Sequence, residues 1–228
     1  LQSFWLPSAL FSASARDGRT ATGPSISSHP RPAFSAAVHA TGLAASTVKS
    51  LVSPAMFSGW GIRTLSSEAI SYNPMSYHNG TIWPHDNSII ASGMRRYGYH
   101  TEAELVARSV IEAGMRFVDH RLPELYCGFN RDRRFNSQPG EYLVSCNPQA
   151  WGSGAIFHFL TVMLGLEVDV LGGRLRIDPV ETPLYSRLHL SGLRVGEDTV
   201  DFTVDQRRGG VRVVVDRCPP NIKAEHPS

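Results

Sequence analysis

The sequence has few cysteines, and this shortage excludes one class of site. Only three of its 228 residues are cysteines, Cys127, Cys146 and Cys218. None belongs to a Cys-x-x-Cys pair, so the spacing does not indicate a zinc site. A sparse, odd number of cysteines is typical of a reducing compartment, so we expect a cytoplasmic protein without a metal or cofactor. A Cys127–Cys146 disulfide fits the count but has no other support in the sequence.

Excess charge and long apolar runs are also missing. The formal net charge of +2 is too small to indicate a nucleic-acid partner. No stretch approaches the ~20 apolar residues that span a membrane, so we expect no membrane partner. With 42% apolar and 18% charged residues, the composition is that of a globular protein. It gives no indication of the oligomeric state.

Acidic residues are nearly absent from the first part of the chain. Residues 1–38 contain Asp17 as their only acidic residue, and the first glutamate is Glu68. This composition resembles a transit peptide, but a disordered tail, or sequence translated out of its proper frame, is the simpler interpretation. We therefore expect little packed structure in 1–38. Because residue 1 is Leu rather than Met, we expect the chain to begin inside a longer product.

Residues 39–167 have the pattern of a helical region. The stretch "TGLAASTVKSLVSP" predicts a short helix that ends before Pro54. A second helix is predicted from Pro84, with Asp86 near its positive end, to a stop at Gly98.

A third helix is predicted to follow at once. Thr101 and Glu104 have the spacing of a capping box. Because the connecting turn is short, the two helices should form an antiparallel hairpin. The apolar residues at helical spacing are Leu105, Val106, Val110, Ile111, Met115 and Val118.

A long irregular connection at 119–146 separates this hairpin from the last predicted helix. Connections of this length are usually functional or disordered. The last helix should start with Asn147 as N-cap and Pro148 at its first position. It is apolar nearly all round from Ala155 to Leu166, so we expect it to be deeply buried.

The final part changes to a period of two. Residues 168–217 predict a small antiparallel sheet, with turns at Gly172-Gly173 and Gly209-Gly210. Residues 218–228 form a tail.

Three loops combine aromatic and polar side chains, which is the composition of sugar-binding sites. They are "MFSGWGIRTL", "SYHNGTIWPHDN" and "RLPELYCGF". Aromatic rings stack on the apolar faces of pyranoses, while amides and carboxylates bind hydroxyls and discriminate between substrates.

Individual residues in these loops allow more than one interpretation. Glu124 lies in an apolar loop, where a carboxylate is either functional, salt-bridged or exposed. Asp86 is commonplace as a helix N-terminal carboxylate, and the spacing of His78 and His85 favours hydrogen bonding over metal binding. Trp151 could face a cleft or be merely half-buried.

Four motifs carry a resemblance to a known family. They are "FSGWGIRTLS", "YNPMSYHNGTIWPHDN", "RLPEL" and "SCNPQAW", in this order. Over about residues 40–205 the chain resembles the C-terminal part of bacterial glycogen-debranching, amylo-alpha-1,6-glucosidase-type glycoside hydrolases. The resemblance implies a mainly helical fold, the C-terminal portion of an (α/α)6 barrel with a small antiparallel β tail.

The resemblance also implies a function, the inverting hydrolysis of alpha-glucosidic bonds in a glucan or oligosaccharide by an exo-acting enzyme. Glu124 would be the catalytic base. The general acid of the family lies further upstream than this chain extends, so we expect a fragment that lacks the acid. Asp86 is not assigned as the general acid. The substrate-binding residues would be Trp60, Arg63, Tyr77, His78, Asn79, Gly80, Trp83, Asp86, Gln149 and Trp151.

Two alternatives stay open at this point. The chain could be an inactive carbohydrate-binding remnant. It could also belong to a related hydrolase of trehalose or of mannosylglycerate-like glycosides.

Overall fold

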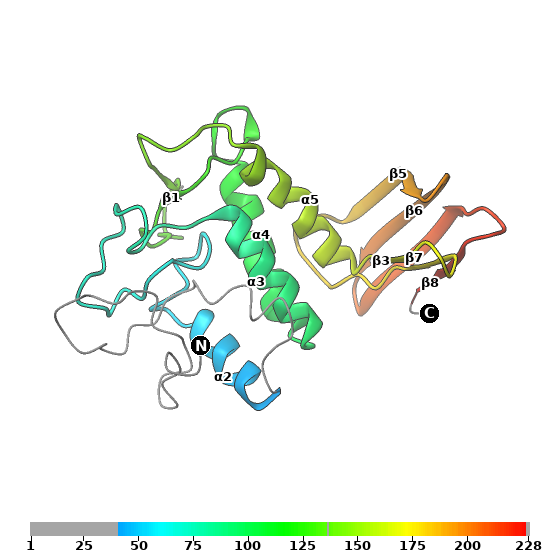
Figure 1. The fold of residues 1–228 in the computed structure, drawn as a ribbon, viewed down its shortest axis with the longest axis horizontal. Coiled ribbons are helices and arrows are strands. Elements are labelled where there is room, and N and C mark those ends of the chain that lie inside the picture. The colour runs from blue at the N-terminus through cyan, green and yellow to red at the C-terminus, as the bar shows by residue number, and fades with distance from the viewer. Residues whose placement is uncertain (1–40, 136, 227–228) are drawn as a thin grey trace. The chain divides into compact units, whose positions relative to one another are not determined.

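The structure is a computed structural model that describes residues 41–135 and 137–226 (Figure 1). The segment 1–38, for which we expected little packed structure, lies outside these residues. The chain divides into two compact units, of which the first ends at Phe159 and the second begins at Leu160.

The first described helix is α2, Thr41–Leu51. Ala44, Val48 and Leu51 are buried on it at the spacing of one helical face. The predicted short helix is therefore confirmed, and it ends before Pro54 as expected.

Helices α3, Pro84–Arg96, and α4, His100–Gly114, form the predicted hairpin (Figure 1). Pro84 occupies the first turn of α3, where a missing N–H costs nothing. Gly98 has φ +86°, a left-handed conformation that favours glycine just after a helix end. The two helices lie side by side because the turn between them is only three residues long.

The start and the buried face of α4 differ from the prediction. The helix begins before Thr101, and its N-cap residue Tyr99 makes no side-chain capping bond. Glu104 instead accepts a hydrogen bond from Arg108 Nε at 2.8 Å, one turn further on. The expected capping box is therefore wrong, and so is part of the apolar face, because Met115 and Val118 are exposed. The buried stripe is formed mainly by small residues, Ala103, Val106, Ala107, Val110 and Ala113.

The long connection after α4 is irregular, as predicted. It contains a 3₁₀ turn, η2, Val118–His120, and two short strands, β1, Tyr126–Cys127, and β2, Gly140–Glu141. The two strands pair antiparallel. In the turn, Asp119 and His120 both have positive φ, at 56° and 53°.

Helix α5, Ala150–Leu164, begins two residues later than predicted. It is not buried all round. Gly152, Ala155 and Phe159 are buried, but Trp151 is 63% exposed and Phe157 is 74% exposed. Apolar composition alone overestimated its burial, because within this chain only one face of the helix is packed.

The second unit contains two three-stranded sheets. In one, β3, Glu167–Asp169, pairs antiparallel with β4, Arg174–Arg176, and β4 pairs in parallel with β8, Lys223–Glu225. The other joins β5, Arg187–Val195, β6, Asp198–Arg207, and β7, Gly210–Arg217, in an antiparallel meander. The predicted hairpins are confirmed, whereas the parallel β8 was not foreseen.

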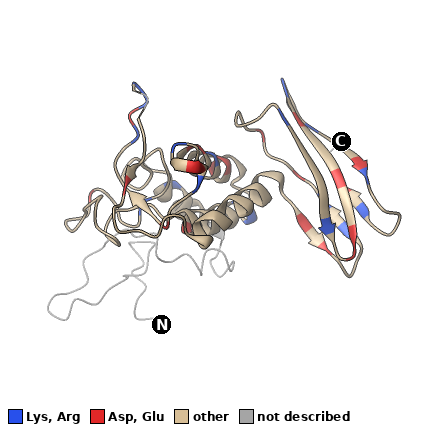
Figure 2. Ribbon diagram, turned by 90° about the horizontal axis from the view of Figure 1, so that it is seen from above, with Lys and Arg blue, Asp and Glu red and all other residues tan. Residues whose placement is uncertain are grey.

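The core of this unit is apolar and its surface carries mixed charges. The core includes Leu175, Val200 and Phe202. Opposite charges are interspersed along the strands (Figure 2), for example in the ion pair of Arg187 with Asp205 at 2.7 Å. Exposed pairs of this kind contribute little stability.

The expectation of a mainly helical (α/α)6-barrel portion is wrong. The described residues contain four α-helices and eight strands in three sheets. Of these helices, α3 and α4 alone are joined by a short turn. The segments 52–83 and 115–149 lack helical period, and the chain after Leu164 alternates with the period of strands.

No helix within the described ranges is both long and apolar enough to cross a bilayer.

Candidate active site

Backbone pairing brings the three sugar-site loops together. Ile82 N donates to Tyr126 O at 2.9 Å, and Tyr126 N donates back to Ile82 O at 3.0 Å. Arg63 forms an antiparallel bridge with the same Ile82. The stretches around Trp60, Trp83 and Glu124 are thus held side by side, although they come from different parts of the sequence.

Glu124 is held at its backbone and at both carboxylate oxygens. Its N–H donates to Cys146 O at 2.9 Å, and Cys146 N–H donates to Oε2 at 3.2 Å. The hydroxyl of Tyr77 donates to Oε1 at 2.5 Å. The side chain is only partly buried, so the carboxylate is fixed in direction while remaining accessible.

These bonds shift two pKa values in opposite directions. The hydrogen bond from Tyr77 lowers the pKa of Glu124, because it stabilises the charged form. The same bond raises the pKa of Tyr77 to about 12, because the carboxylate accepts a hydrogen bond from the phenol and so stabilises its protonated form. Near neutral pH the pair is therefore a phenol and a carboxylate, the state that a general base requires.

Aromatic rings surround this carboxylate. Tyr77 contacts Trp83 edge to face, with 4.8 Å between ring centroids, and His78 stacks on Trp83 at 5.6 Å. Tyr142, from the long connection, contacts Tyr77 at 6.0 Å. The backbone carbonyl of Tyr77 accepts a hydrogen bond from Trp83 Nε1 at 3.2 Å, which fixes the indole relative to the loop.

A second stacked pair joins α3 to α5. The rings of His85 and Trp151 lie 4.3 Å apart and are inclined by 27°. His85 is buried, and its Nε2 lies 3.1 Å from Asp86 Oδ1. A further link between the same helices is the 3.0 Å contact of His158 Nδ1 with Ser88 Oγ. One face of the exposed Trp151 indole is thus covered by a fixed imidazole.

The position of Asp86 agrees with a structural use. Its side chain is buried against His85 at the start of α3, where a carboxylate also suits the helix dipole. The geometry therefore supports a structural role at the start of α3, which is the commonplace interpretation of a helix N-terminal carboxylate.

Trp60 and Arg63 are buried in the core. Trp60 is 2% exposed, and the Arg131 guanidinium covers its ring at 4.2 Å. Arg63 is 1% exposed and donates from Nε to Gly128 O at 2.7 Å and from one terminal nitrogen to Asn130 Oδ1 at 2.5 Å. Burial lowers the pKa of Arg63. Both residues therefore help to hold the three loops together through buried contacts.

Asn79 and Gly80 differ from each other in exposure. Asn79 is exposed. Gly80 is buried, and its N–H donates to Thr64 Oγ1 at 2.9 Å. A Cβ on Gly80 would lie 2.6 Å from the Tyr72 ring, so this position requires glycine for close packing.

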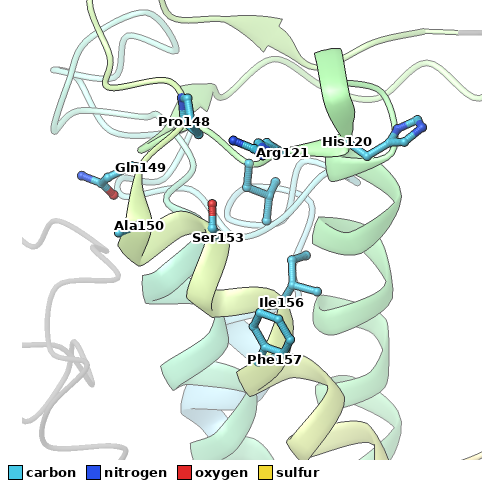
Figure 3. Close-up of a pocket in the computed structure, with 9 residues that line it drawn as sticks. His120, Arg121, Pro148, Gln149, Ala150, Ser153, Ile156 and Phe157 are labelled. Atoms are coloured by element: carbon cyan, nitrogen blue, oxygen red, sulfur yellow. The ribbon is translucent and has the colours of Figure 1, made fainter. Parts of the chain in front are cut away.

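Gln149 belongs to a pocket next to this site (Figure 3). Its Oε1 is buried and has no hydrogen-bond partner in the described part of the chain. Leaving an acceptor in this state costs about 1–3 kcal/mol. The oxygen therefore retains its capacity to accept a hydrogen bond.

Sequence reasoning missed two groups that contact the site, Tyr142 and the N–H of Cys146. Cys146 lies inside a motif that pointed to sugar binding, but it was considered only as a thiol. All three cysteines are free. Tyr142 had no signal beyond being an aromatic residue in the long connection. Among the described residues, no group of three His, Cys, Asp or Glu side chains could hold a metal ion.

Comparison with known proteins agrees with a glycosidase. Residues 8–130 match the family model described as "Mannosylglycerate hydrolase MGH1-like glycoside hydrolase domain". The match begins inside the segment 1–38, which its composition had set apart and which lies outside the stretch that the motifs cover. No curated protein matched the chain.

Solved structures share part of the fold. The GH63 mannosylglycerate hydrolase from Thermus thermophilus in complex with Tris and D-glycerate has a TM-score of 0.54 at 18% identity. The same enzyme in complex with glucose has a TM-score of 0.50, also at 18% identity. Each comparison covers 70% of this chain but only 35% of the other, so this chain spans about a third of their length.

The glycoside hydrolase assignment made from the motifs is confirmed at the level of the enzyme class, while the debranching type is not. Because the family model covers more than half of the 228 residues, the chain belongs to the MGH1-like family of glycoside hydrolase domains.

Proposed function

We propose that this chain acts in the hydrolysis of a small glycoside of the mannosylglycerate type, with Glu124 as the catalytic base. The family and the name of its structural neighbour favour this substrate class over an alpha-1,6-glucan. The observation that carries the proposal is the carboxylate of Glu124, which is oriented by Tyr77 and Cys146 beside an aromatic cluster.

In this proposal the sugar lies against the aromatic rings, and Glu124 removes a proton from water. The water oxygen attacks the anomeric carbon as the bond to the leaving group breaks, and a general acid protonates the leaving oxygen. Inverting enzymes keep the two carboxyl groups roughly 6.5–9.5 Å apart to make room for the water. We assign the base and leave the acid unassigned, because Asp86 is already paired with His85.

The contact residues in the proposal are those near Glu124 with accessible surface. Trp151 provides an exposed ring face, His78 is exposed, and Tyr77 and Trp83 are partly exposed. Asn79 is exposed in the same loop. Trp60, Arg63 and Gly80 support these residues rather than touch the sugar.

The test is turnover of mannosylglycerate, trehalose and isomaltose by the 228-residue chain, with the anomer of the first product determined by NMR. Glu124→Gln should lower the rate by about 10²- to 10⁴-fold, since it removes a general base. Glu68→Gln, at an exposed position, is the matched control. An unchanged rate in Glu124→Gln would refute the assignment of the base.

The other arms of the assay separate the competing functions. Preference for isomaltose would favour the debranching type. Binding of glucose without turnover of any substrate would favour a carbohydrate-binding remnant.

A further inference from the structure

A hollow in the second unit lies between the segment that precedes β5 and the turn that joins β6 to β7. Its volume is about 510 Å³, within the ~300–1,000 Å³ of small-molecule sites. Six residues line it, namely Glu181, Thr182, Pro183, Gln206, Arg207 and Arg208. All six belong to the second unit, whereas every residue of the candidate sugar site belongs to the first.

The side chain of Gln206 fixes the two sides of this hollow to each other. Its Oε1 accepts a hydrogen bond from Thr182 N at 3.3 Å, and its Nε2 donates to Val180 O at 3.1 Å. The backbone N–H of Gln206 donates to Ser186 O at 2.8 Å. Thr182 is buried, and its Oγ1 accepts a hydrogen bond from Leu184 N at 3.2 Å. The hollow is therefore built on an ordered, hydrogen-bonded frame.

Arginines outnumber carboxylates at this end of the sheet. Asp205 on β6 lies opposite Arg187 on β5 and opposite Arg212 on β7. Arg187 donates to both oxygens of this carboxylate, at 2.7 and 3.4 Å. Arg207 Nη2 remains 3.7 Å from the same carboxylate, which is too far for a hydrogen bond. The charge of Asp205 is thus neutralised by its neighbours across the strands, and Arg207 keeps donors for another anion.

Arg208 supplies a second cation to the hollow. It is exposed, in the turn before Gly209, whose φ of +93° favours glycine. In the described part of the chain it forms no ion pair, and neither does Glu181, the acidic residue of the lining. Two neighbouring guanidinium groups match the charge of about −1.5 to −2 that a phosphomonoester carries near pH 7. Their planar forks also donate paired hydrogen bonds to phosphate oxygens, so the pair favours phosphate over a single carboxylate.

The other lining groups suit a body that carries hydroxyls. A phosphate ion would occupy only a small part of the 510 Å³. Glu181 can only accept hydrogen bonds when ionised, so it repels an anion but pairs with hydroxyl donors attached to one. Pro183 adds an apolar ring next to it. Cations, an acceptor carboxylate and an apolar surface in one hollow fit a ligand that is anionic at one end and hydroxylated at the other.

We propose that this hollow binds a phosphorylated monosaccharide. The phosphate pairs with Arg207 and Arg208, and hydroxyls of the sugar donate to the carboxylate of Glu181. Pro183 contacts the carbon atoms of the sugar ring. This binding does not depend on the reaction proposed for Glu124.

The experiment is isothermal titration of the 228-residue chain with glucose 6-phosphate. Glucose and inorganic phosphate are the two halves of this probe, and glucuronate carries a carboxylate in place of the phosphate. The variants are the double substitution Arg207→Gln with Arg208→Gln, which removes both charges, and Glu181→Ala, which removes the acceptor. Arg194→Gln is the matched control, because Arg194 is exposed on β5 and does not line the hollow. Circular dichroism verifies that each variant is folded.

We expect glucose 6-phosphate to bind about 10-fold more tightly than inorganic phosphate or glucuronate. The double substitution should weaken it about 10- to 100-fold, as for loss of charged hydrogen bonds, and added salt should weaken it too. Glu181→Ala should weaken glucose 6-phosphate without weakening inorganic phosphate, and Arg194→Gln should change neither.

Three results would overturn the proposal. They are an affinity for glucose 6-phosphate that the double substitution leaves unchanged, inorganic phosphate that binds as tightly as the sugar phosphate, and glucuronate that binds as tightly. The second would indicate a site for a simple anion only. None of these results bears on the assignment of Glu124, which is tested by turnover.

Discussion

The hydroxyl of Tyr77 lies 2.5 Å from Oε1 of Glu124, although 47 residues separate them in the sequence. The bond joins the loop that precedes α3 to the long connection that follows α4. It also sets the protonation state of the carboxylate, since it lowers the pKa of Glu124.

Tyr77→Phe should raise the pKa of Glu124. The phenol stabilises the ionised form, so its removal makes protonation occur at a higher pH. If Glu124 is the base, the acidic limb of kcat/KM moves to higher pH, because the carboxylate is lost sooner as the pH falls. The pKa can be read directly from the ¹³C shift of the labelled Glu124 carboxyl, whether or not the chain turns over substrate.

Tyr142→Phe is the control for this titration, because Tyr142 contacts the Tyr77 ring and has no hydrogen bond to Glu124 in the described structure. The carboxyl shift of Tyr142→Phe should titrate as in the unmodified chain. If the pKa of Glu124 is the same in Tyr77→Phe as in the unmodified chain, the Tyr77 hydrogen bond does not set the protonation of this carboxylate.

The stack of His85 on Trp151 predicts a graded effect on sugar affinity. Trp151→Ala should weaken glucose binding about 2- to 10-fold, the usual contribution of an aromatic contact. His85→Ala should weaken it as well, because the indole loses the ring that supports its inner face. His85→Phe restores a flat surface and should recover most of the affinity.

Titration calorimetry with glucose measures these changes. Phe135→Ala removes an exposed aromatic outside the cluster and should have no effect. Equal losses in His85→Phe and His85→Ala would show that stacking is not what positions Trp151.

Local elements could be predicted because their signals are local. α2, α3 and the hairpins of the second unit follow from periodicity, Pro84 and paired glycines. The capping box failed because Arg108 competes for Glu104 one turn away. The predicted fold class was wrong for a different reason. It was inferred from a family resemblance and not from the segments that have helical period.

The candidate site was only partly predictable. Composition led to Glu124 and to the loop with Tyr77 and Trp83, and the structure brings these residues together. Composition cannot distinguish a ring that faces a ligand from one that faces the core, so Trp60 was placed with the sugar although it is buried beneath Arg131. That distinction depends on long-range packing.

Arg63→Met should destabilise the first unit. Arg63 donates to Gly128 O, to Asn130 Oδ1 and to the carbonyls of Pro54 and Ala55. Methionine fills a similar space but leaves several of these acceptors buried without a donor, at a cost of about 2–4 kcal/mol.

The denaturation midpoint in urea, followed by tryptophan fluorescence, measures this cost. The described tryptophans, Trp60, Trp83 and Trp151, all belong to the first unit. Arg133→Met, at an exposed position, should change the midpoint little. A small effect of Arg63→Met would contradict the structural role of this cation.

Two glycines should respond oppositely to alanine. A Cβ on Gly128 would lie 1.7 Å from Gly80 O, and a backbone atom cannot move aside as a flexible side chain can. Gly128→Ala should therefore destabilise the first unit by about 3 kcal/mol, the cost of severe overpacking.

Gly154 is the matched position. It lies inside α5, and a Cβ there meets nothing within 4 Å. Gly154→Ala should stabilise the unit by about 0.5–1 kcal/mol, because alanine loses less conformational entropy in a helix. The urea midpoints of the two variants measure both changes in stability. If Gly128→Ala had the same urea midpoint as the unmodified chain, the loops of Gly80 and Gly128 would not approach each other in solution. The packing that supports Tyr77 and Glu124 would then be absent as well.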